Sequence, residues 1–239
     1  MNSIIVIPTY NERENIKRLV EAVFALNLGL HILVVDDNSL DGTREIAQEF
    51  CRSNPDQFFL LERPAKLGLG SAYLDGFRYA LSKNYDYIFE MDADFSHRPA
   101  YLPDFLKALE KYDVVVGSRY INHTVNVVNW PLKRLVISFL ASKYVRLFLG
   151  LKIFDPTTGF KVFHRRVLEK INLDKVKSRG YSIQFEVIYR AAKNGFSLGE
   201  IPIVFYDRID GYSKLYSRVV WEAVYMVWYL RIMSLLGRI

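Results

Sequence analysis

The chain has 239 residues, of which 51% are hydrophobic and 24% charged, with 13 Gly and 8 Pro. This composition excludes disordered, collagen-like and low-complexity proteins, and the length suits one α/β domain, residues 1–239, with a sizeable core. The net charge of +6 is compatible with nucleic acid, anionic lipid or a solvated basic face, and the lone Cys51 excludes an intrachain disulfide. The apolar run at residues 4–7 is too short for a signal peptide, so we expect no export.

Short apolar strands alternate with helices through the first half of the chain. We predict strands at residues 3–8, 30–36, 58–62, 87–91 and 114–117, and helices from residue 12, at 43–50, at 71–82 and before the last strand. Such alternation is typical of a mostly parallel central sheet with helices on both faces, which binds ligands beyond the carboxyl ends of its strands. The polar or turn-forming residues at these ends are Pro8, Asp36, Asp37, Asp92, Asp94 and Arg119.

After residue 122 the pattern changes to longer helices with Lys and Arg on one side. We predict amphipathic helices at residues 131–149 and from 217 to the C-terminus, with one late strand at 197–206 between them. The uncharged runs 135–142 and 223–230 are shorter than the roughly 18 residues that a spanning helix needs, so a membrane role would be peripheral. The aromatic stripe of Trp221, Tyr225 and Trp228 fits either core packing or membrane contact.

Two acidic clusters are candidate binding sites. Residues 90–94 read EMDAD, and in an extended or turning backbone Asp92 and Asp94 point the same way, so both can reach one Mg²⁺ or Mn²⁺ ion. A lone motif of this kind also occurs in ordinary surface loops. In the second cluster, Ser39, Asp41 and Gly42 suit a turn and a helix start, whereas the adjacent charges of Asp36 and Asp37 require a ribose, a base amide or solvent.

Several segments resemble the family 2 glycosyltransferases, and among them the dolichol-phosphate (polyprenol-phosphate) mannose synthases. They are IPTYNERENI, VVDDNSLDGT, KLGLGSAYLDGF, MDADFSHRP, VGSRY, FDPTTGFKVFHRRVLEKI and GEIPIVFYDRIDGYSKL. The resemblance covers nearly the whole chain in unchanged order. It implies a GT-A type fold and inverting transfer of mannose from GDP-mannose to a polyprenyl phosphate, with residues 1–122 as the nucleotide-sugar half and 123–239 as the acceptor and membrane-facing half.

Carried over by position, the resemblance assigns roles to individual residues. Base and ribose would contact Pro8, Tyr10, Glu12, Asp36 and Asp37, and the donor site would also include Lys66, Asp92, Ala93, Asp94, Arg208 and Lys214. The metal ligands would be Asp92, Asp94 and Ser96, and the acceptor phosphate would contact Arg119, Arg134 and Ser138. The catalytic set is Asp92, Asp94, Arg119 and Arg208. Lys66 also fits a solvated loop, and Gly68 and Gly70 fit a tight turn better than a phosphate cradle.

The chemistry of the acceptor supports the same residues. A phosphate monoester carries roughly −1.5 to −2 charges near pH 7, so it needs no general base to attack a sugar. It does need cationic groups that hold two anions together. Arg134 and Ser138 are four residues apart on a predicted helix and share a face, while His97 fits a structural hydrogen bond better than catalysis.

Other interpretations remain open at the level of sequence. The donor is alternatively UDP-glucose, or the acceptor a protein or saccharide. A noncatalytic nucleotide- or nucleic-acid-binding module is the remote alternative, and we expect no nucleic-acid partner because no such motif is present. We expect a peripheral protein on the cytoplasmic face of a membrane, docked through residues 130–149 and aided by the terminal helix or by a small membrane-anchoring subunit.

Overall fold

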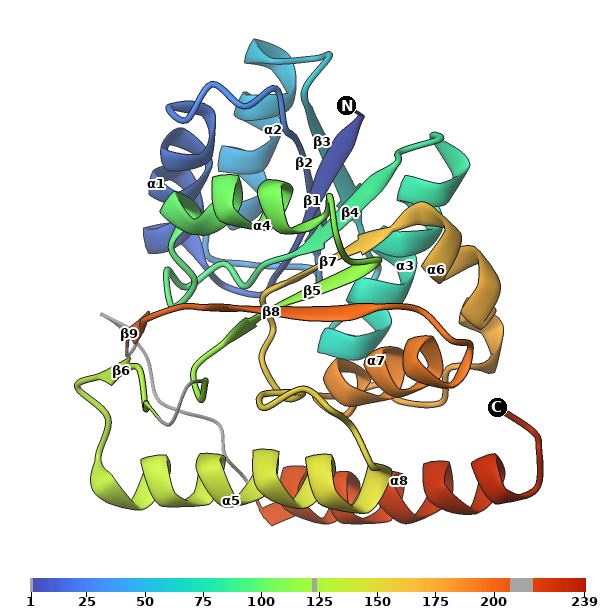
Figure 1. The fold of residues 1–239 in the computed structure, drawn as a ribbon. Coiled ribbons are helices and arrows are strands. Elements are labelled where there is room, and N and C mark those ends of the chain that lie inside the picture. The colour runs from blue at the N-terminus through green and yellow to red at the C-terminus, as the bar shows by residue number, and fades with distance from the viewer. Residues whose placement is uncertain (1, 122–123, 207–216) are drawn as a thin grey trace.

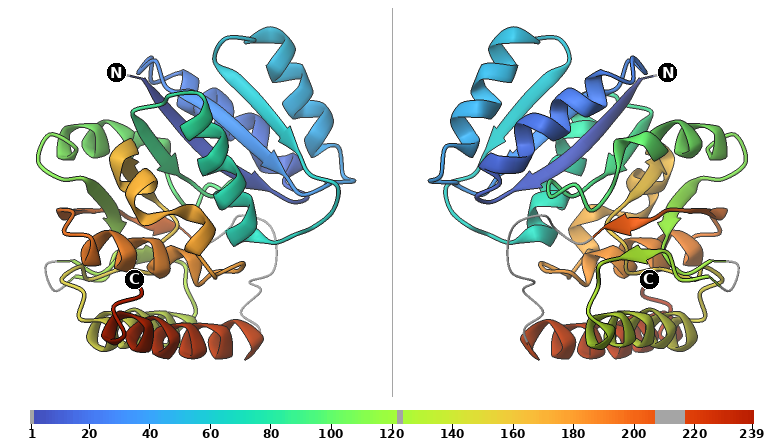
Figure 2. Two further views of the ribbon diagram at one scale, coloured as in Figure 1. Left: turned by 90° about the vertical axis from the view of Figure 1, so that its right-hand side faces the viewer. Right: turned by 90° about the vertical axis from the view of Figure 1, so that its left-hand side faces the viewer.

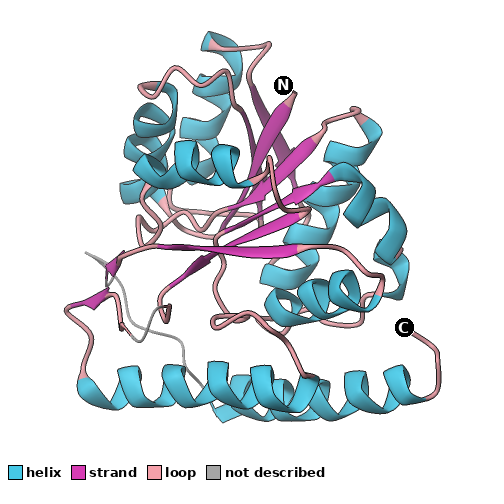
Figure 3. Cartoon of the chain, in the orientation of Figure 1, coloured by secondary structure: helices cyan, strands magenta, loops and turns pink. Residues whose placement is uncertain are grey.

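The computed structural model describes residues 2–121, 124–206 and 217–239, without the side chains of 217–219. Within these ranges a seven-stranded sheet in the order β3-β2-β1-β4-β7-β5-β8 is covered by helices on both faces (Figures 1 and 3). The predicted α/β class with a mostly parallel sheet is therefore confirmed.

The elements of the first half lie close to the predicted ranges. They are β1 (Ser3–Thr9), α1 (Arg13–Phe24), β2 (His31–Asp36), α2 (Thr43–Ser53), β3 (Phe58–Glu62), α3 (Leu69–Ser82), β4 (Tyr87–Glu90), the 3-10 helix η1 (Pro99–Tyr101), α4 (Leu102–Ala108) and β5 (Val114–Ser118). The agreement follows from the uninterrupted burial of the strands: in β1, for example, residues 4–7 are fully buried.

The second half contains more elements than the sequence predicts. They are β6 (Val127–Val128), α5 (Leu132–Leu149), β7 (Lys161–His164), α6 (Arg165–Ile171), the 3-10 helix η2 (Leu173–Lys175), α7 (Ile183–Lys193), β8 (Leu198–Pro202), β9 (Phe205–Tyr206) and α8 (Ser217–Leu235). The prediction of one strand at 197–206 is wrong. After Pro202 the chain leaves β5, and β9 pairs instead with β6 in a separate two-stranded sheet.

The strand order places a ligand site at one rim. Strand β1 pairs in parallel with β2 and with β4, so the order reverses between β1 and β4. Strand β7 is inserted antiparallel between β4 and β5, and the remaining pairings of the sheet are parallel. The carboxyl ends of β1, β2, β4 and β5 consequently face the same side of the molecule, which is where open α/β sheets bind ligands.

Two hydrophobic clusters flank the sheet. One lies under α1, α2 and α4 and includes Ile16, Phe89 and Phe105. The other lies under α3, α6 and α7 and extends to α5 and α8 through Val145 and Val227. The pair of long helices is thus attached to the core by a limited inner surface.

Helices α5 and α8 lie side by side as a layer beyond the rest of the domain (Figures 1 and 2). Phe148 contacts Trp228 across the pair, with ring centroids 5.4 Å apart. Both helices carry exposed apolar side chains, which together are called the apolar face of this pair: Leu132, Val136, Ile137, Phe139, Leu140, Leu147 and Phe148 on α5, and Val220, Trp221, Tyr225, Trp228, Ile232 and Leu235 on α8. In the described part of the chain, no helix is long and apolar enough to cross a bilayer.

Candidate active site

The predicted site residues of the first half gather at the switch point between β1 and β4. The turns after β1 and β2 are joined by hydrogen bonds from Asn11 N to Ser39 Oγ, at 2.9 Å, and from Glu12 N to Thr43 Oγ1, at 2.9 Å. Asp41 Oδ1 accepts from the Thr43 N–H at 3.0 Å, which confirms the interpretation of Asp41 as a residue that supports a turn and helix start. Tyr10 and Glu12 therefore lie in a loop that hydrogen bonds to the turn after β2 hold in place.

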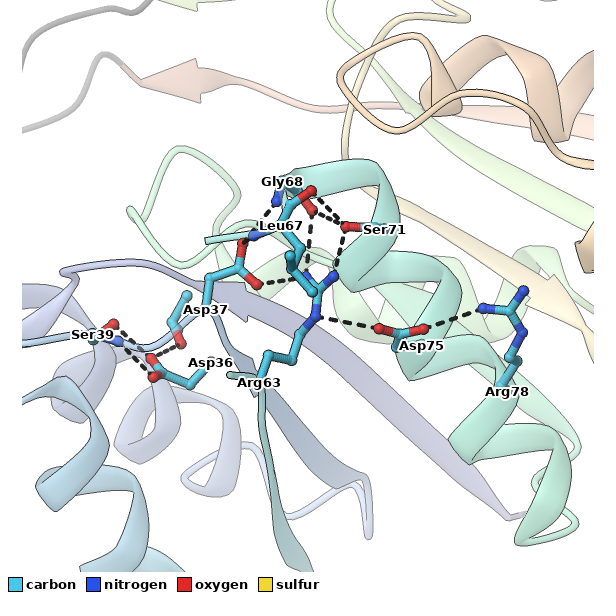
Figure 4. A network of polar contacts seen from close by, with 10 residues as sticks. Asp36, Asp37, Ser39, Arg63, Leu67, Gly68, Ser71, Asp75 and Arg78 are labelled. Carbon is cyan, nitrogen blue, oxygen red and sulfur yellow. Dashed lines mark hydrogen bonds and ion pairs between the residues drawn. The ribbon is translucent and has the colours of Figure 1, made fainter. Parts of the chain in front are cut away.

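Asp36 and Asp37 are buried, and each has its own set of protein partners (Figure 4). Asp36 Oδ1 accepts from Thr9 Oγ1 at 2.8 Å and from Ser39 Oγ at 2.6 Å. The expectation that a nucleotide or solvent must account for these two adjacent charges is wrong, because hydroxyl, amide and guanidinium groups of the protein already stabilise them.

Asp37 connects the end of β2 to the start of α3. Its Oδ2 accepts from the backbone N–H groups of Leu67 and Gly68, at 3.1 and 2.9 Å, and its Oδ1 pairs with the guanidinium of Arg63 (Figure 4). A carboxylate is favoured there because these amides lie at the helix N-terminus. Arg63 also bonds to Ser71 Oγ at 2.6 Å.

The glycines before α3 serve a tight turn and close packing. Gly68 has φ of +100°, and Gly70 N donates to the carbonyl oxygen of Arg179 at 2.9 Å. A Cβ on Gly70 would lie 2.7 Å from the Arg179 carbonyl carbon, so a side chain would displace the loop. This confirms the turn interpretation. The Nζ of Lys66 lies 3.7 Å from the ring centroid of Tyr10, which brings two predicted donor-binding residues together.

Asp92 follows β4 and is held by groups from three segments. Tyr73 of α3 donates its hydroxyl to Asp92 Oδ1 at 2.9 Å, and the Asp92 N–H donates to His97 Nδ1 at 3.3 Å. Burial lowers the pKa of His97, which favours the neutral ring that this acceptor role requires. His97 is thus a structural hydrogen-bonding residue here. A Cβ on Gly159 would lie 2.9 Å from Asp92 Oδ2.

Asp94 and Ser96 complete the predicted metal-binding turn. Asp94 Oδ1 accepts from the Ser96 N–H at 3.0 Å, and the Ser96 hydroxyl is buried with no hydrogen-bond partner among the described residues. Two carboxylates and a hydroxyl at one strand end fit Mg²⁺ or Mn²⁺. Among the described residues, no three His, Cys, Asp or Glu side chains are placed to hold one metal ion, so further ligands would be water, substrate oxygens or groups beyond the described ranges.

A buried ion pair lies directly beneath this turn. Lys161 Nζ of β7 donates to Glu90 Oε2 at 2.8 Å and to the side-chain oxygen of Gln184, and both charged side chains are fully buried. Burial raises the pKa of Glu90 and lowers that of Lys161. These residues do not stand out in the sequence, because a lysine in a strand is normally a surface residue.

Arg119, just past β5, is buried against Asp155. Its Nε donates to Asp155 Oδ2 at 2.6 Å, its Nη2 donates to Oδ1 at 2.8 Å, and its backbone N–H also donates to Oδ2, at 3.0 Å. Burial opposes both charges, yet the pair raises the pKa of Arg119 and lowers that of Asp155. Ser142 of α5 donates to Asp155 Oδ1 at 3.0 Å, so α5 joins the same network.

The other predicted acceptor residues lie close to Arg119. The guanidinium carbons of Arg119 and Arg134 lie 5.7 and 4.3 Å from the ring centroid of Trp130. Tyr120, next to Arg119, donates its hydroxyl to Ser138 Oγ at 2.9 Å. The structure therefore brings the three predicted acceptor residues into one neighbourhood. Arg208 and Lys214 lie outside the described residues.

A comparison of the sequence with protein families gives a match to "Glycosyl transferase family 2" over residues 4–172. The chain belongs to glycosyltransferase family 2. This family 2 glycosyltransferase is 44% identical to the polyprenol monophosphomannose synthase of Mycolicibacterium smegmatis, across 94% of this chain and 85% of that protein. It is 41% identical to the undecaprenyl-phosphate mannosyltransferase of Micrococcus luteus, across 94% and 91%.

The fold of this glycosyltransferase is also found among solved structures. Glucosyl-3-phosphoglycerate synthase from Mycobacterium tuberculosis, in complex with Mn²⁺, UDP and phosphoglyceric acid, superposes with a TM-score of 0.67 at 16% identity, covering 99% of this chain and 78% of that one. The complex of the same enzyme with phosphoglyceric acid gives 0.66 at 14% identity. At this identity the likeness concerns the fold, which is the GT-A type that the sequence resemblance implies.

Proposed function

We propose that this enzyme transfers mannose, with inversion, from GDP-mannose to a polyprenyl phosphate on the cytoplasmic face of a membrane. The two mannosyltransferases that share 41–44% identity over 94% of the chain act, by their names, on lipid phosphates of this kind. The geometry supports the same reaction, because candidate sites for two anions lie next to each other.

The observation that carries the proposal is one short loop that touches both candidate sites. At its start, Asp155 forms the ion pair with Arg119, on the acceptor side. At its end, Gly159 lies against the carboxylate of Asp92, on the donor side. Only the three residues 156–158 therefore separate the ion-pair partner of Arg119 from the residue that lies against Asp92. A direct displacement at the sugar requires this proximity of nucleophile and leaving group.

On the donor side, the base and ribose would lie against Pro8, Tyr10, Glu12, Asp36 and Asp37. Because Asp36 and Asp37 are buried and held by protein partners, they would fix the shape of this part of the site. Lys66, whose Nζ lies over the ring of Tyr10, would contact the nucleotide beside that ring. Ala93, Arg208 and Lys214 would complete the diphosphate contacts.

Asp92, Asp94 and Ser96 would hold a Mg²⁺ or Mn²⁺ ion. A bound divalent cation stabilises the negative charge that develops on the departing nucleoside diphosphate. The buried Glu90 and Lys161 pair beneath them fixes the end of β4, from which both aspartates project. The protein's contribution is to keep these oxygens in place.

On the acceptor side, Arg134, Ser138 and Arg119 would orient the phosphate. This nucleophile is already ionised, so neutral, buried His97 is not needed as a base. The exposed apolar face of α5 and α8 suits the lipid to which the phosphate is attached. Lys133 and Lys143 are exposed on α5 and suit an anionic membrane surface. A small membrane-anchoring subunit would bind the same face.

A transfer assay tests the proposal. The protein is incubated with Mn²⁺, a polyprenyl phosphate in vesicles and radiolabelled GDP-mannose or UDP-glucose, and lipid-linked sugar is extracted. We expect labelled lipid from GDP-mannose, and none after chelation of the metal. Product from UDP-glucose alone would assign the alternative donor, and transfer that is insensitive to chelation would contradict the metal site.

A further inference from the structure

The hydroxyl of Tyr73 is directed at a carboxylate of the candidate metal site from an element remote in sequence. Tyr73 is a fully buried residue of α3, and its hydroxyl lies 2.9 Å from Oδ1 of Asp92. Its ring is stacked with Phe77, with centroids 6.1 Å apart, so hydrophobic packing sets the position of the ring. The hydroxyl is therefore not needed to place the ring, and its contact with Asp92 calls for another role.

Two further groups restrict Asp92, one at its backbone and one at its carboxylate. The backbone of Asp92 is bonded to His97, and the Cα of Gly159 faces both carboxylate oxygens: a Cβ there would lie 2.9 Å from Oδ2 and 3.1 Å from Oδ1. The Asp92 side chain thus fills the space that any other residue at 159 would occupy. The Asp92 side chain is 29% exposed, and these contacts restrict the orientation of its buried part.

We propose that Tyr73 is a positioning residue for the metal site, whose hydroxyl fixes the Asp92 carboxylate in the orientation that binds a divalent cation together with Asp94. The inference rests on the proposed metal-dependent transfer. Groups that hydrogen-bond to metal ligands typically change metal affinity by about 10- to 100-fold when they are removed. Gly159 serves the same purpose by leaving room for the carboxylate.

The chain offers a matched control for the loss of one buried hydroxyl. Tyr189 is also a buried helical tyrosine, and its hydroxyl has no hydrogen-bond partner among the described residues. Tyr73→Phe and Tyr189→Phe make the same chemical change, and each leaves the ring in place. Only the first removes a contact with Asp92.

The test measures Mn²⁺ binding to the whole protein in the presence of GDP, by the loss of the electron paramagnetic resonance signal of free Mn²⁺. We expect the Kd for Mn²⁺ to rise about tenfold or more in Tyr73→Phe and to stay at the wild-type value in Tyr189→Phe. In transfer assays Tyr73→Phe should need correspondingly more Mn²⁺ for half-maximal rate, and saturating Mn²⁺ should restore most of kcat. A role in packing alone would not move this metal dependence.

Two results overturn the inference in distinguishable ways. If Tyr73→Phe binds Mn²⁺ within twofold of wild type while wild type binds it tightly, the hydroxyl does not position Asp92 and the proposed function stands. If wild type itself binds no Mn²⁺ with GDP, the metal-dependent function fails, and the role of Tyr73 fails with it.

Discussion

The side chains of Arg119 and Asp155 form a buried two-point ion pair, with Nε to Oδ2 at 2.6 Å and Nη2 to Oδ1 at 2.8 Å. Asp155 in turn accepts from Ser142, which ties α5 to the loop after β5. The residue proposed to contact the acceptor phosphate is therefore oriented by a carboxylate inside the protein, and through it by the helix that carries the exposed apolar face.

Asp155→Asn should lower the free energy of unfolding by about 3–5 kcal/mol, because it leaves Arg119 buried without its counter-charge. Urea denaturation at pH 7 measures the change. The pair of half-buried Arg165 and exposed Glu169, also joined at 2.6 Å, provides the control: Glu169→Gln should cost less than about 1 kcal/mol. Equal losses for the two variants would show that the buried pair does not stabilise the fold.

The contribution of Asp155 should depend on pH in one direction. Its pKa is lowered in the folded protein: burial opposes ionisation, but Arg119 outweighs that effect. A carboxyl group whose pKa is lowered by folding stabilises the fold fully at pH values above its pKa in the unfolded chain, 3.8. This contribution is lost as the pH falls through the pKa of the folded state. The difference in the free energy of unfolding between wild type and Asp155→Asn should thus be constant from pH 5 to 7 and shrink below about pH 3.8. A difference that grows on acidification would contradict the ion pair.

Asp94→Asn should reduce kcat more than tenfold, because it removes a charge from the proposed metal site while it keeps the shape of the side chain. Steady-state transfer rates at saturating substrates give the comparison. Retention of more than about a tenth of the wild-type kcat, a loss below roughly 1.4 kcal/mol, would rule out the metal role. The circular dichroism spectrum must remain that of wild type.

Arg134→Ala should raise KM for polyprenyl phosphate far more than KM for the sugar nucleotide. Arg134 lies over Trp130 on the side of the molecule that carries α5, whereas the donor residues lie beyond the opposite end of the short 155–159 loop. Kinetics with each substrate varied in turn separate the two constants. A parallel rise in both would place Arg134 in the donor site or in the general fold.

The apolar face of α5 and α8 should bind anionic vesicles. Replacing Leu132, Leu140 and Leu147 by Ser should abolish flotation with vesicles, because these side chains are 74%, 55% and 65% exposed and contribute little to the core. Leu40→Ser, at an 87% exposed leucine on the β2 to α2 turn, is the control and should float normally. Salt should weaken binding without removing it, since screening acts on the basic residues alone.

Equal flotation of the triple variant and wild type, or no flotation of wild type at low salt, would contradict docking through this face. If wild type does not float, the molecular mass of the protein in solution should be measured, because a stable dimer would cover the same side chains. The alternative that the stripe of Trp221, Tyr225 and Trp228 packs in the core does not hold, because these side chains are 72%, 65% and 50% exposed.

The sequence alone determined the alternation of strands and helices and the polar residues at the strand ends. Both are local properties: a buried parallel strand such as β2 must be apolar throughout, and the chain must turn directly after it. The resemblance of several blocks in unchanged order, MDADFSHRP among them, also led to the correct family. Periodicity and short motifs carry this information because they depend on neighbours within a few residues.

The tertiary structure decided which groups hold the site in place. Strand β7 lies antiparallel within the sheet and carries the buried Lys161. Its sequence resembles that of a surface segment, and only the structure shows that Glu90 neutralises this lysine. Tyr73 reaches Asp92, and Asp155 reaches Arg119, across 19 and 36 residues. The free energy of burying such groups depends on partners that only the folded sheet brings near. The order of the strands in the sheet determines those partners, and the spacing of residues in the sequence does not reveal that order.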